Sequence, residues 1–136
     1  MRILVSGAGT AGLSAGIDLA RVGHEVEVVE RTDHPRVNGS PIDVPGAAIE
    51  TARRMGILDS VHEHRITMTE QTRLIDRSGA AVAPLVGQEI DESPEDIEIP
   101  REDLMNILRR ALPERVDLRF EESIATLVDD GDRVAV

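Results

Sequence analysis

The first thirty residues alternate between short apolar runs and one longer amphipathic stretch. Residues 3–5 are a continuous apolar run, as in a strand that is buried on both faces of a parallel sheet. Residues 13–22 place apolar side chains on one helical face, and Gly23 follows where helices often end. Residues 25–30 are rich in valine and predict a second strand. The pattern therefore predicts a strand–helix–strand unit over residues 2–30.

The rest of the chain contains two further helical patterns and several short strand patterns. Residues 31–46 hold three prolines and two glycines and predict a long loop, whereas residues 47–55 have helical composition. Residues 102–112 carry an apolar stripe, begin with two acids and stop at a proline, so they predict the best-defined helix. Strands are predicted over residues 72–76, 80–83, 116–120, 123–128 and 133–136.

These elements predict an α/β fold, namely a Rossmann-like domain with a parallel central sheet. The predicted strands on either side of residues 77–79 form a hairpin. This hairpin and the acidic, turn-rich residues 86–98 predict part of a second, β-rich region over residues 72–98. The chain stops inside an apparent hairpin, so we expect residues 1–136 to be one piece of a longer polypeptide or to work with a second chain.

Composition excludes several classes of function. Fifteen basic and 26 acidic side chains give a net charge of −11, which disfavours nucleic acid as a partner. No apolar run approaches the roughly 20 residues that span a bilayer, so no membrane partner is predicted. The chain contains no cysteine and no lysine, which excludes thiolate nucleophiles, cysteine–metal sites and Schiff bases. The absence of a thiol and of an export signal predicts a cytoplasmic protein.

The turn after the first strand carries a glycine motif with a recognised mechanism. Gly7 allows the tight turn, Gly9 allows backbone to approach a pyrophosphate, and Gly12 allows helix and strand to pack closely. The free N–H groups from Thr10 onward lie at a helix N-terminus, where an anion is favoured. Glu30 ends the second strand, where an acid accepts hydrogen bonds from adenosine ribose hydroxyls and repels the 2′-phosphate of NADP. These features predict a dinucleotide site and leave FAD and NAD open; the alternative is a turn that binds nothing.

The segment GAGTAGLSAGIDLARVGHEVEVVER resembles the opening of the FAD-dependent aromatic hydroxylases, which are single-component flavoprotein monooxygenases. Within that family it is most similar to the branch that oxidises polyketides and tetracyclines. Three later segments support the resemblance, namely RVNGSPID at 36–43, GAAIETARRMGILDS at 46–60 and IPREDL at 99–104. The resemblance covers essentially all 136 residues but only the first part of the family's pattern. It implies that residues 1–136 are the N-terminal part of an FAD-binding domain.

The resemblance also implies a cofactor, a reaction and a set of contacts. FAD would be the cofactor and NAD(P)H the reductant, and an aromatic or polyketide-like small molecule would be hydroxylated with O₂. The flavin carries this chemistry, so no catalytic side chain is implied. The glycine-rich loop, including Ala11, would cradle the FAD pyrophosphate, while Glu30 would hold the ribose and Arg31 would lie beside the adenosine.

Three further positions match cofactor contacts of the same family. Arg36 matches a loop position that contacts the nicotinamide cofactor, Asp43 matches one that faces the flavin, and Arg101 would reach the ribityl or phosphate region. Each has a plainer interpretation. Arg36 would be a solvated loop arginine, Asp43 a strand or turn acid, and Arg101 an exposed arginine that pairs with Glu98.

Other hypotheses remain at this stage. An NAD-dependent or other FAD/NAD-linked oxidoreductase would share residues 2–30, and a truncated, non-catalytic dinucleotide-binding module would explain the abrupt end. A homo-oligomer or a complementing C-terminal chain would cover the exposed sheet edge. His62 and His64 are interpreted as surface histidines, so no metal site is predicted.

Overall fold

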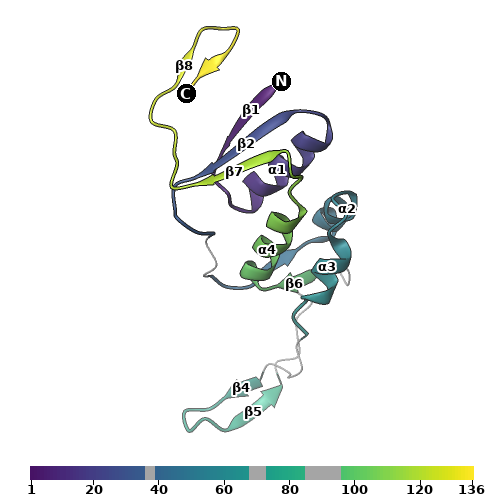
Figure 1. Ribbon diagram of the computed structural model, residues 1–136. Coiled ribbons are helices and arrows are strands. Elements are labelled where there is room, and N and C mark those ends of the chain that lie inside the picture. Colours follow the sequence, from purple (N-terminus) through teal and green to yellow (C-terminus); the bar gives the residue numbers. More distant parts are fainter. Residues whose placement is uncertain (36–38, 68–72, 85–95) are drawn as a thin grey trace.

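The computed structural model describes residues 1–35, 39–67, 73–84 and 96–136 (Figure 1). Its strands are β1 (Arg2–Ser6), β2 (Glu25–Glu30), β3 (Ile42–Val44), β4 (Arg73–Ile75), β5 (Ala81–Pro84), β6 (Ile97–Ile99), β7 (Val116–Phe120), β8 (Val128–Asp129) and β9 (Val134–Ala135). Its helices are α1 (Thr10–Arg21), α2 (Gly46–Arg54), α3 (Leu58–Glu63) and α4 (Arg101–Ala111). The predicted α/β class is confirmed.

The predicted strand–helix–strand unit is present as β1, α1 and β2. The two strands pair in parallel, and β7 pairs in parallel with the other edge of β2. Helix α1 packs very closely on this sheet at Gly16, where an added Cβ would lie 3.2 Å from a Val28 methyl and 3.3 Å from a Leu112 methyl. Because Leu112 directly follows α4, the same glycine brings α1, α4 and the sheet together.

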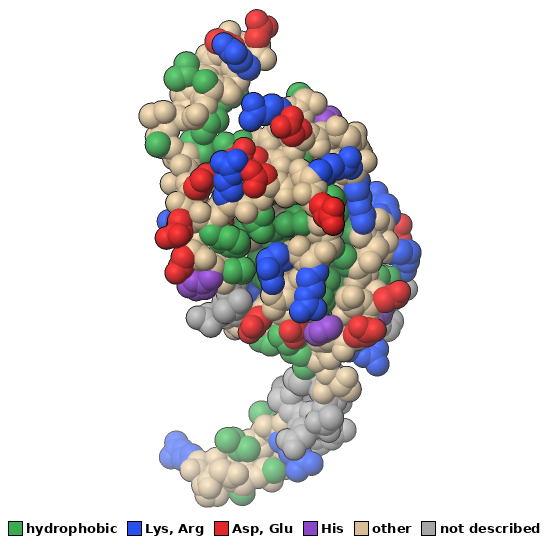
Figure 2. Space-filling model, in the orientation of Figure 1, with side chains coloured by type: hydrophobic (Ala, Val, Ile, Leu, Met, Phe, Trp, Pro, Cys, Tyr) green, Lys and Arg blue, Asp and Glu red, His purple; other side chains and the backbone are tan. Residues whose placement is uncertain are grey.

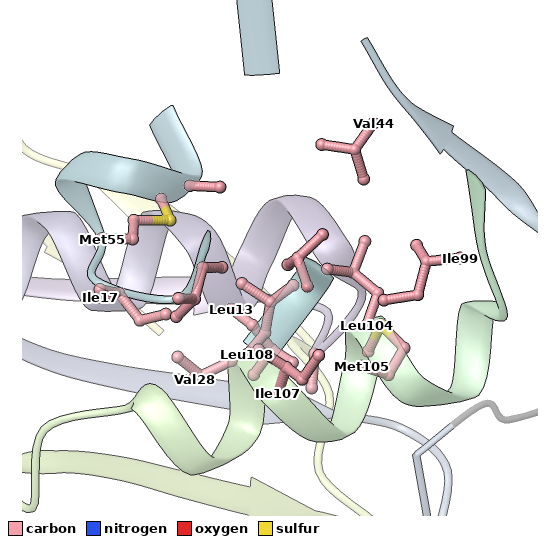
Figure 3. Close-up of a cluster of buried hydrophobic side chains, with 14 of the residues drawn as sticks. Leu13, Ile17, Val28, Val44, Met55, Ile99, Leu104, Met105, Ile107 and Leu108 are labelled. Atoms are coloured by element: carbon pink, nitrogen blue, oxygen red, sulfur yellow. The ribbon is translucent and has the colours of Figure 1, made fainter. Parts of the chain in front are cut away.

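The core lies between the sheet and the helices and is aliphatic, in a chain that has one Phe and no Trp or Tyr. Figure 3 shows Leu13 and Ile17 of α1 packed with Leu108 of α4 and Val28 of β2. The apolar stripe of α4 buries Leu104, Met105, Ile107 and Leu108. Among the described residues, no polar or charged side chain is fully buried.

Residues 42–44 and 97–99 form strands, which corrects the prediction that both segments are irregular. Strands β3 and β6 pair antiparallel, with Ile42 opposite Ile99 and Asp43 opposite Glu98. Each strand has only three residues, which is too few for a recognisable alternation. Their pairing comes from contact between distant parts of the chain. Helix α3 is likewise a short element of six residues that periodicity does not predict.

The strand predicted over residues 123–128 is wrong for most of its length. Of these residues only Val128 lies in a strand, β8, which pairs with β9 in the hairpin expected at the end of the chain. Residues 123–127 are mostly exposed and pair with no strand of the described chain. A local apolar pattern without a neighbouring strand does not hold an extended ladder, because the backbone groups have no partner.

Two hairpins project from the main body (Figure 1). Strands β4 and β5 pair antiparallel, as predicted for the segment around residues 77–79, and β8 and β9 form the second hairpin. Both hairpins expose large apolar side chains, and Figure 2 shows this apolar surface at both ends of the molecule. The assignment of residues 72–98 to a substrate region remains a prediction. No helix within the described ranges is long and apolar enough to cross a bilayer.

Candidate functional site

The glycine-rich loop between β1 and α1 has a geometry that two of its glycines make possible. Gly7 has a φ of +103°, and its N–H donates to the Val29 carbonyl at 2.7 Å, which joins the loop to β2. A Cβ at Gly12 would lie 1.8 Å from the Gly7 carbonyl oxygen. No side chain can be accommodated there, so Gly12 allows α1 to begin directly against the preceding turn.

The N-terminus of α1 is open to an incoming anion. Gly9 is the N-cap residue, it provides no side-chain cap, and the first turn of α1 contains no acid. A Cβ at Gly9 would meet no atom within 4 Å, so the space in front of this backbone is free of described protein atoms. The first N–H groups of a helix lack partners within the helix and carry a partial positive charge. The N–H groups of Thr10, Ala11 and Gly12 are therefore available for a phosphate or pyrophosphate.

Glu30 lies beside this loop at the end of β2. Its carboxylate accepts a hydrogen bond from the Ala8 N–H at 2.9 Å and two from Thr32, from the N–H at 3.2 Å and the hydroxyl at 3.1 Å. The bond from Ala8 does most to lower the pKa of Glu30, and the bonds from Thr32 and the charge of Arg31 act in the same direction against partial burial. An ionised acceptor is thus held next to the glycine-rich loop.

Ala8 and Thr32 are hydrogen-bond partners of Glu30 that the sequence analysis did not identify. Thr32 lies two residues after Glu30, a spacing at which hydroxyl and N–H groups often bond to an acid, so it was detectable in principle. The bond from Ala8 joins residues 22 positions apart. Only the parallel pairing of β1 with β2 brings these two groups together.

The structure also brings the start of α4 to the start of α1. The Thr10 hydroxyl contacts the Met105 sulfur at 3.6 Å, and Arg101 lies about one helical turn before Met105. Arg101 is half-buried, and its side chain lies over Gly39, where an added Cβ would be 2.9 Å from Arg101 Nε. The alternative pairing with Glu98 is not found, because within the described residues no carboxylate forms an ion pair with Arg101.

The remaining candidate residues are placed as follows. Arg31 is exposed directly after β2, and Asp43 is exposed in β3 opposite Glu98. Arg36 lies outside the described residues. His62 is exposed, and within the part of the chain that the structure describes no three His, Asp or Glu side chains gather in a way that would hold a metal. The geometry therefore brings together the glycine loop, Glu30 and the helix start that carries Arg101.

A family model described as an FAD binding domain matches residues 1–136. An uncharacterised protein of Mycobacterium tuberculosis is 39% identical over 139 residues, which is 98% of this chain and 37% of that protein. A flavin-dependent monooxygenase of Legionella longbeachae is 35% identical over 137 residues, which is 100% of this chain and 35% of that protein.

Two solved structures are also similar to this chain. The tetracycline destructase Tet(51) is similar with a TM-score of 0.80 and 33% identity over 98% of this chain. The tetracycline destructase Tet(55) is similar with a TM-score of 0.81 and 30% identity over 96% of this chain. This chain spans 33% and 32% of those two structures, so it corresponds to about a third of the proteins it resembles.

Proposed function

This chain belongs to the FAD-binding domain family, and on that premise we propose that it is the FAD-binding portion of a flavin-dependent monooxygenase. The named relatives include flavin-dependent monooxygenases and tetracycline destructases. We further propose that the substrate is an aromatic or polyketide-like small molecule and that NAD(P)H and O₂ are the co-reactants. One observation supports the cofactor most directly, namely an uncapped helix N-terminus in open space beside an ionised glutamate.

The residues of the site suit the pyrophosphate, the adenosine half and the flavin half of FAD. The helix start after Gly9 would hold the pyrophosphate, because the first N–H groups of α1 lack partners within the helix and its first turn contains no acid. Glu30 would accept hydrogen bonds from the ribose hydroxyls through its remaining lone pairs. Arg31 would lie beside the adenosine, and Arg101 would reach the phosphate or ribityl region from the start of α4. Asp43 is assigned to the flavin side of the site, by resemblance alone.

FAD, when bound, supplies the oxygen-activating chemistry of a monooxygenase. The chain's own residues would bind and orient the cofactor, and the aliphatic core beside the loop would exclude water from one side of it. Arg36 would contact the nicotinamide cofactor. No nucleophilic side chain is needed, which agrees with a chain that has no cysteine and no lysine.

NAD remains the competing ligand, because the loop and Glu30 suit any adenine dinucleotide. The half-buried Arg101 favours FAD, since in the proposed arrangement it lies at the end of the site that the flavin half would occupy. Flavin fluorescence anisotropy distinguishes the two ligands. The chain contains no Trp and no Tyr, so bound flavin meets few aromatic quenchers and its emission remains usable. We expect anisotropy to rise on titration with the protein, and NAD to compete only weakly.

The variant Gly9→Ala tests the site. Gly9 has a φ of −78°, which alanine adopts without strain, and open space surrounds its Cα. We expect an unchanged midpoint of thermal unfolding and an FAD Kd at least about tenfold higher, because the new methyl group enters the space of the pyrophosphate. Gly23→Ala at the other end of α1 is the control. Its φ of +95° makes that variant less stable, but its FAD Kd should not change.

Two results would overturn the proposal. The first is flavin anisotropy that does not respond to the folded wild-type chain. The second is NAD that binds more tightly than FAD, which would indicate an NAD-linked protein. A Gly9→Ala variant that binds FAD like the wild type would place the cofactor elsewhere.

A further inference from the structure

Gly39 and Arg101 are far apart in the sequence and lie in direct contact. An added Cβ at position 39 would be 2.9 Å from Arg101 Nε, 3.2 Å from Cδ and 3.8 Å from Cζ. Three consecutive heavy atoms of the arginine therefore lie over the Cα of Gly39. The arginine lies on a surface that exists only because residue 39 has no side chain.

The backbone at position 39 is also one that glycine adopts readily. Its φ is +149°, in the range that side-chain-bearing residues rarely adopt. An added Cβ at four of the other described glycines with positive φ would meet nothing within 4 Å, namely Gly7, Gly23, Gly79 and Gly131. At the fifth, Gly56, it would make only an ordinary contact, 3.8 Å from the Arg21 guanidinium. Position 39 combines positive φ with a close contact to a charged side chain.

The Arg101 side chain needs contacts with other groups to be held in one position. A long arginine loses conformational entropy when it is held in one position, and a cation at a helix N-terminus is disfavoured by the helix dipole. Within the described residues, no carboxylate pairs with Arg101 to offset these costs. Its position is nevertheless half-buried against the loop of Gly39. An anionic ligand beside the guanidinium would make this arrangement favourable.

We propose that Gly39 is a positioning residue for Arg101, and that the missing side chain lets the guanidinium point to the anionic part of a dinucleotide at the start of α1. The contact of Thr10 with Met105 places the start of α1 beside the first turns of α4, the helix that begins at Arg101. This inference rests on the proposed function, because it takes FAD to be the ligand. It makes Gly39 part of the cofactor site through shape rather than through a polar group.

Gly39→Ala, Arg101→Met and the double variant test the proposal. We expect each single variant to raise the FAD Kd by about tenfold, the size of one lost charge-assisted contact. The double variant should bind no more weakly than Arg101→Met, because Gly39 acts only through Arg101. Gly79→Ala is the control, since Gly79 also has positive φ but lies in the projecting hairpin with open space around it. That control should bind FAD like the wild type.

A second measurement needs no cofactor. In the NMR spectrum of arginine Nε–Hε groups, the signal assigned through its loss in Arg101→Met should shift in Gly39→Ala and remain in place in Gly79→Ala. If Gly39 had only a structural role, Gly39→Ala would lower the stability of the chain. Its effect on the FAD Kd would then add to that of Arg101→Met in the double variant. Additive effects on the FAD Kd, or an unmoved Arg101 signal, overturn the proposal. A wild-type chain that does not bind FAD refutes the proposed function instead, and the NMR signal still decides whether Gly39 positions Arg101.

Discussion

At the scale of single residues, Glu30 has the most closely defined environment of the site. Its two carboxylate oxygens accept from Ala8 and Thr32, so it joins the glycine loop to the end of β2. A lowered pKa means that ionised Glu30 stabilises the folded chain. This contribution is fully present above the ordinary carboxyl pKa of 4.5 and is lost as the pH falls through the lowered value.

Glu30→Gln should therefore show a pH-dependent loss of stability. At pH 7 we expect the free energy of unfolding to fall by about 1 kcal/mol, because the amide has one acceptor oxygen where the carboxylate has two, so it loses the bond from Ala8 or those from Thr32. The difference from the wild type should shrink once the pH falls well below 4.5, since the wild-type carboxyl is then protonated as well. Urea unfolding at both pH values measures this. Glu63→Gln, at an exposed residue, is the control, and an equal loss at both pH values would mean that charge is not the cause.

At the scale of elements, two arginines hold helix ends together. Arg21 in the last turn of α1 donates to the Arg54 carbonyl at 2.7 Å and to the Met55 carbonyl at 2.6 Å, at the end of α2. Arg115 donates in turn to the Ala20 carbonyl at the end of α1. The last carbonyls of a helix lack partners within the helix and carry a partial negative charge, so a cation is favoured there. These bonds link α2 to α1 and α1 to the loop before β7.

Arg21→Met tests the first link. Methionine keeps much of the apolar stem and removes both donors, so we expect a loss of about 1–2 kcal/mol in the free energy of unfolding. FAD affinity should change little, because Arg21 lies at the opposite end of α1 from the glycine loop. Arg110→Met is the matched control, as Arg110 is exposed in the last turn of α4. Chemical denaturation measures the stability of both variants. Equal losses would contradict the assignment of Arg21 as a link between α1 and α2.

At the scale of the whole molecule, charge repulsion opposes the folded state. The net charge is −11, and basic residues are locally outnumbered as well. Arg119 on β7 lies 2.7 Å from Asp117, 3.2 Å from Glu27 and 3.8 Å from Glu122, so a single cation faces three acids. Such exposed pairs contribute little to stability, and a like-charged surface destabilises the compact state.

Added salt should accordingly stabilise the chain. The screening length falls to about 8 Å at physiological ionic strength, which weakens long-range repulsion more than close contacts. Between low salt and roughly 0.2 M NaCl we expect the thermal midpoint to rise by about 2–5 °C. Differential scanning calorimetry measures this shift, with sodium sulfate at equal ionic strength as a comparison. A falling midpoint would show that ion pairs such as those of Arg119 outweigh the general repulsion.

The sequence determined the strand–helix–strand unit, the helix over residues 101–111 and the aliphatic nature of the core. These features depend on local periodicity and on composition, which a single segment carries by itself. The glycine loop was predictable for the same reason, because its glycines follow one strand and precede one helix within a single short segment of the chain. The resemblance to flavoprotein monooxygenases depended on these local motifs and agreed with the family match.

Only the tertiary structure decided the contacts between distant segments. The pairing of β3 with β6, the bond from Ala8 to Glu30 and the packing of Arg101 on Gly39 each join residues far apart along the chain. No local pattern encodes these contacts, because they depend on how separate elements pack. The predicted strand at residues 123–128 failed over residues 123–127 for the same reason, since a strand needs a neighbour and the described chain provides none for those residues. Local sequence determined the long elements, and long-range packing determined the short strands β3 and β6 and which residues meet at the site.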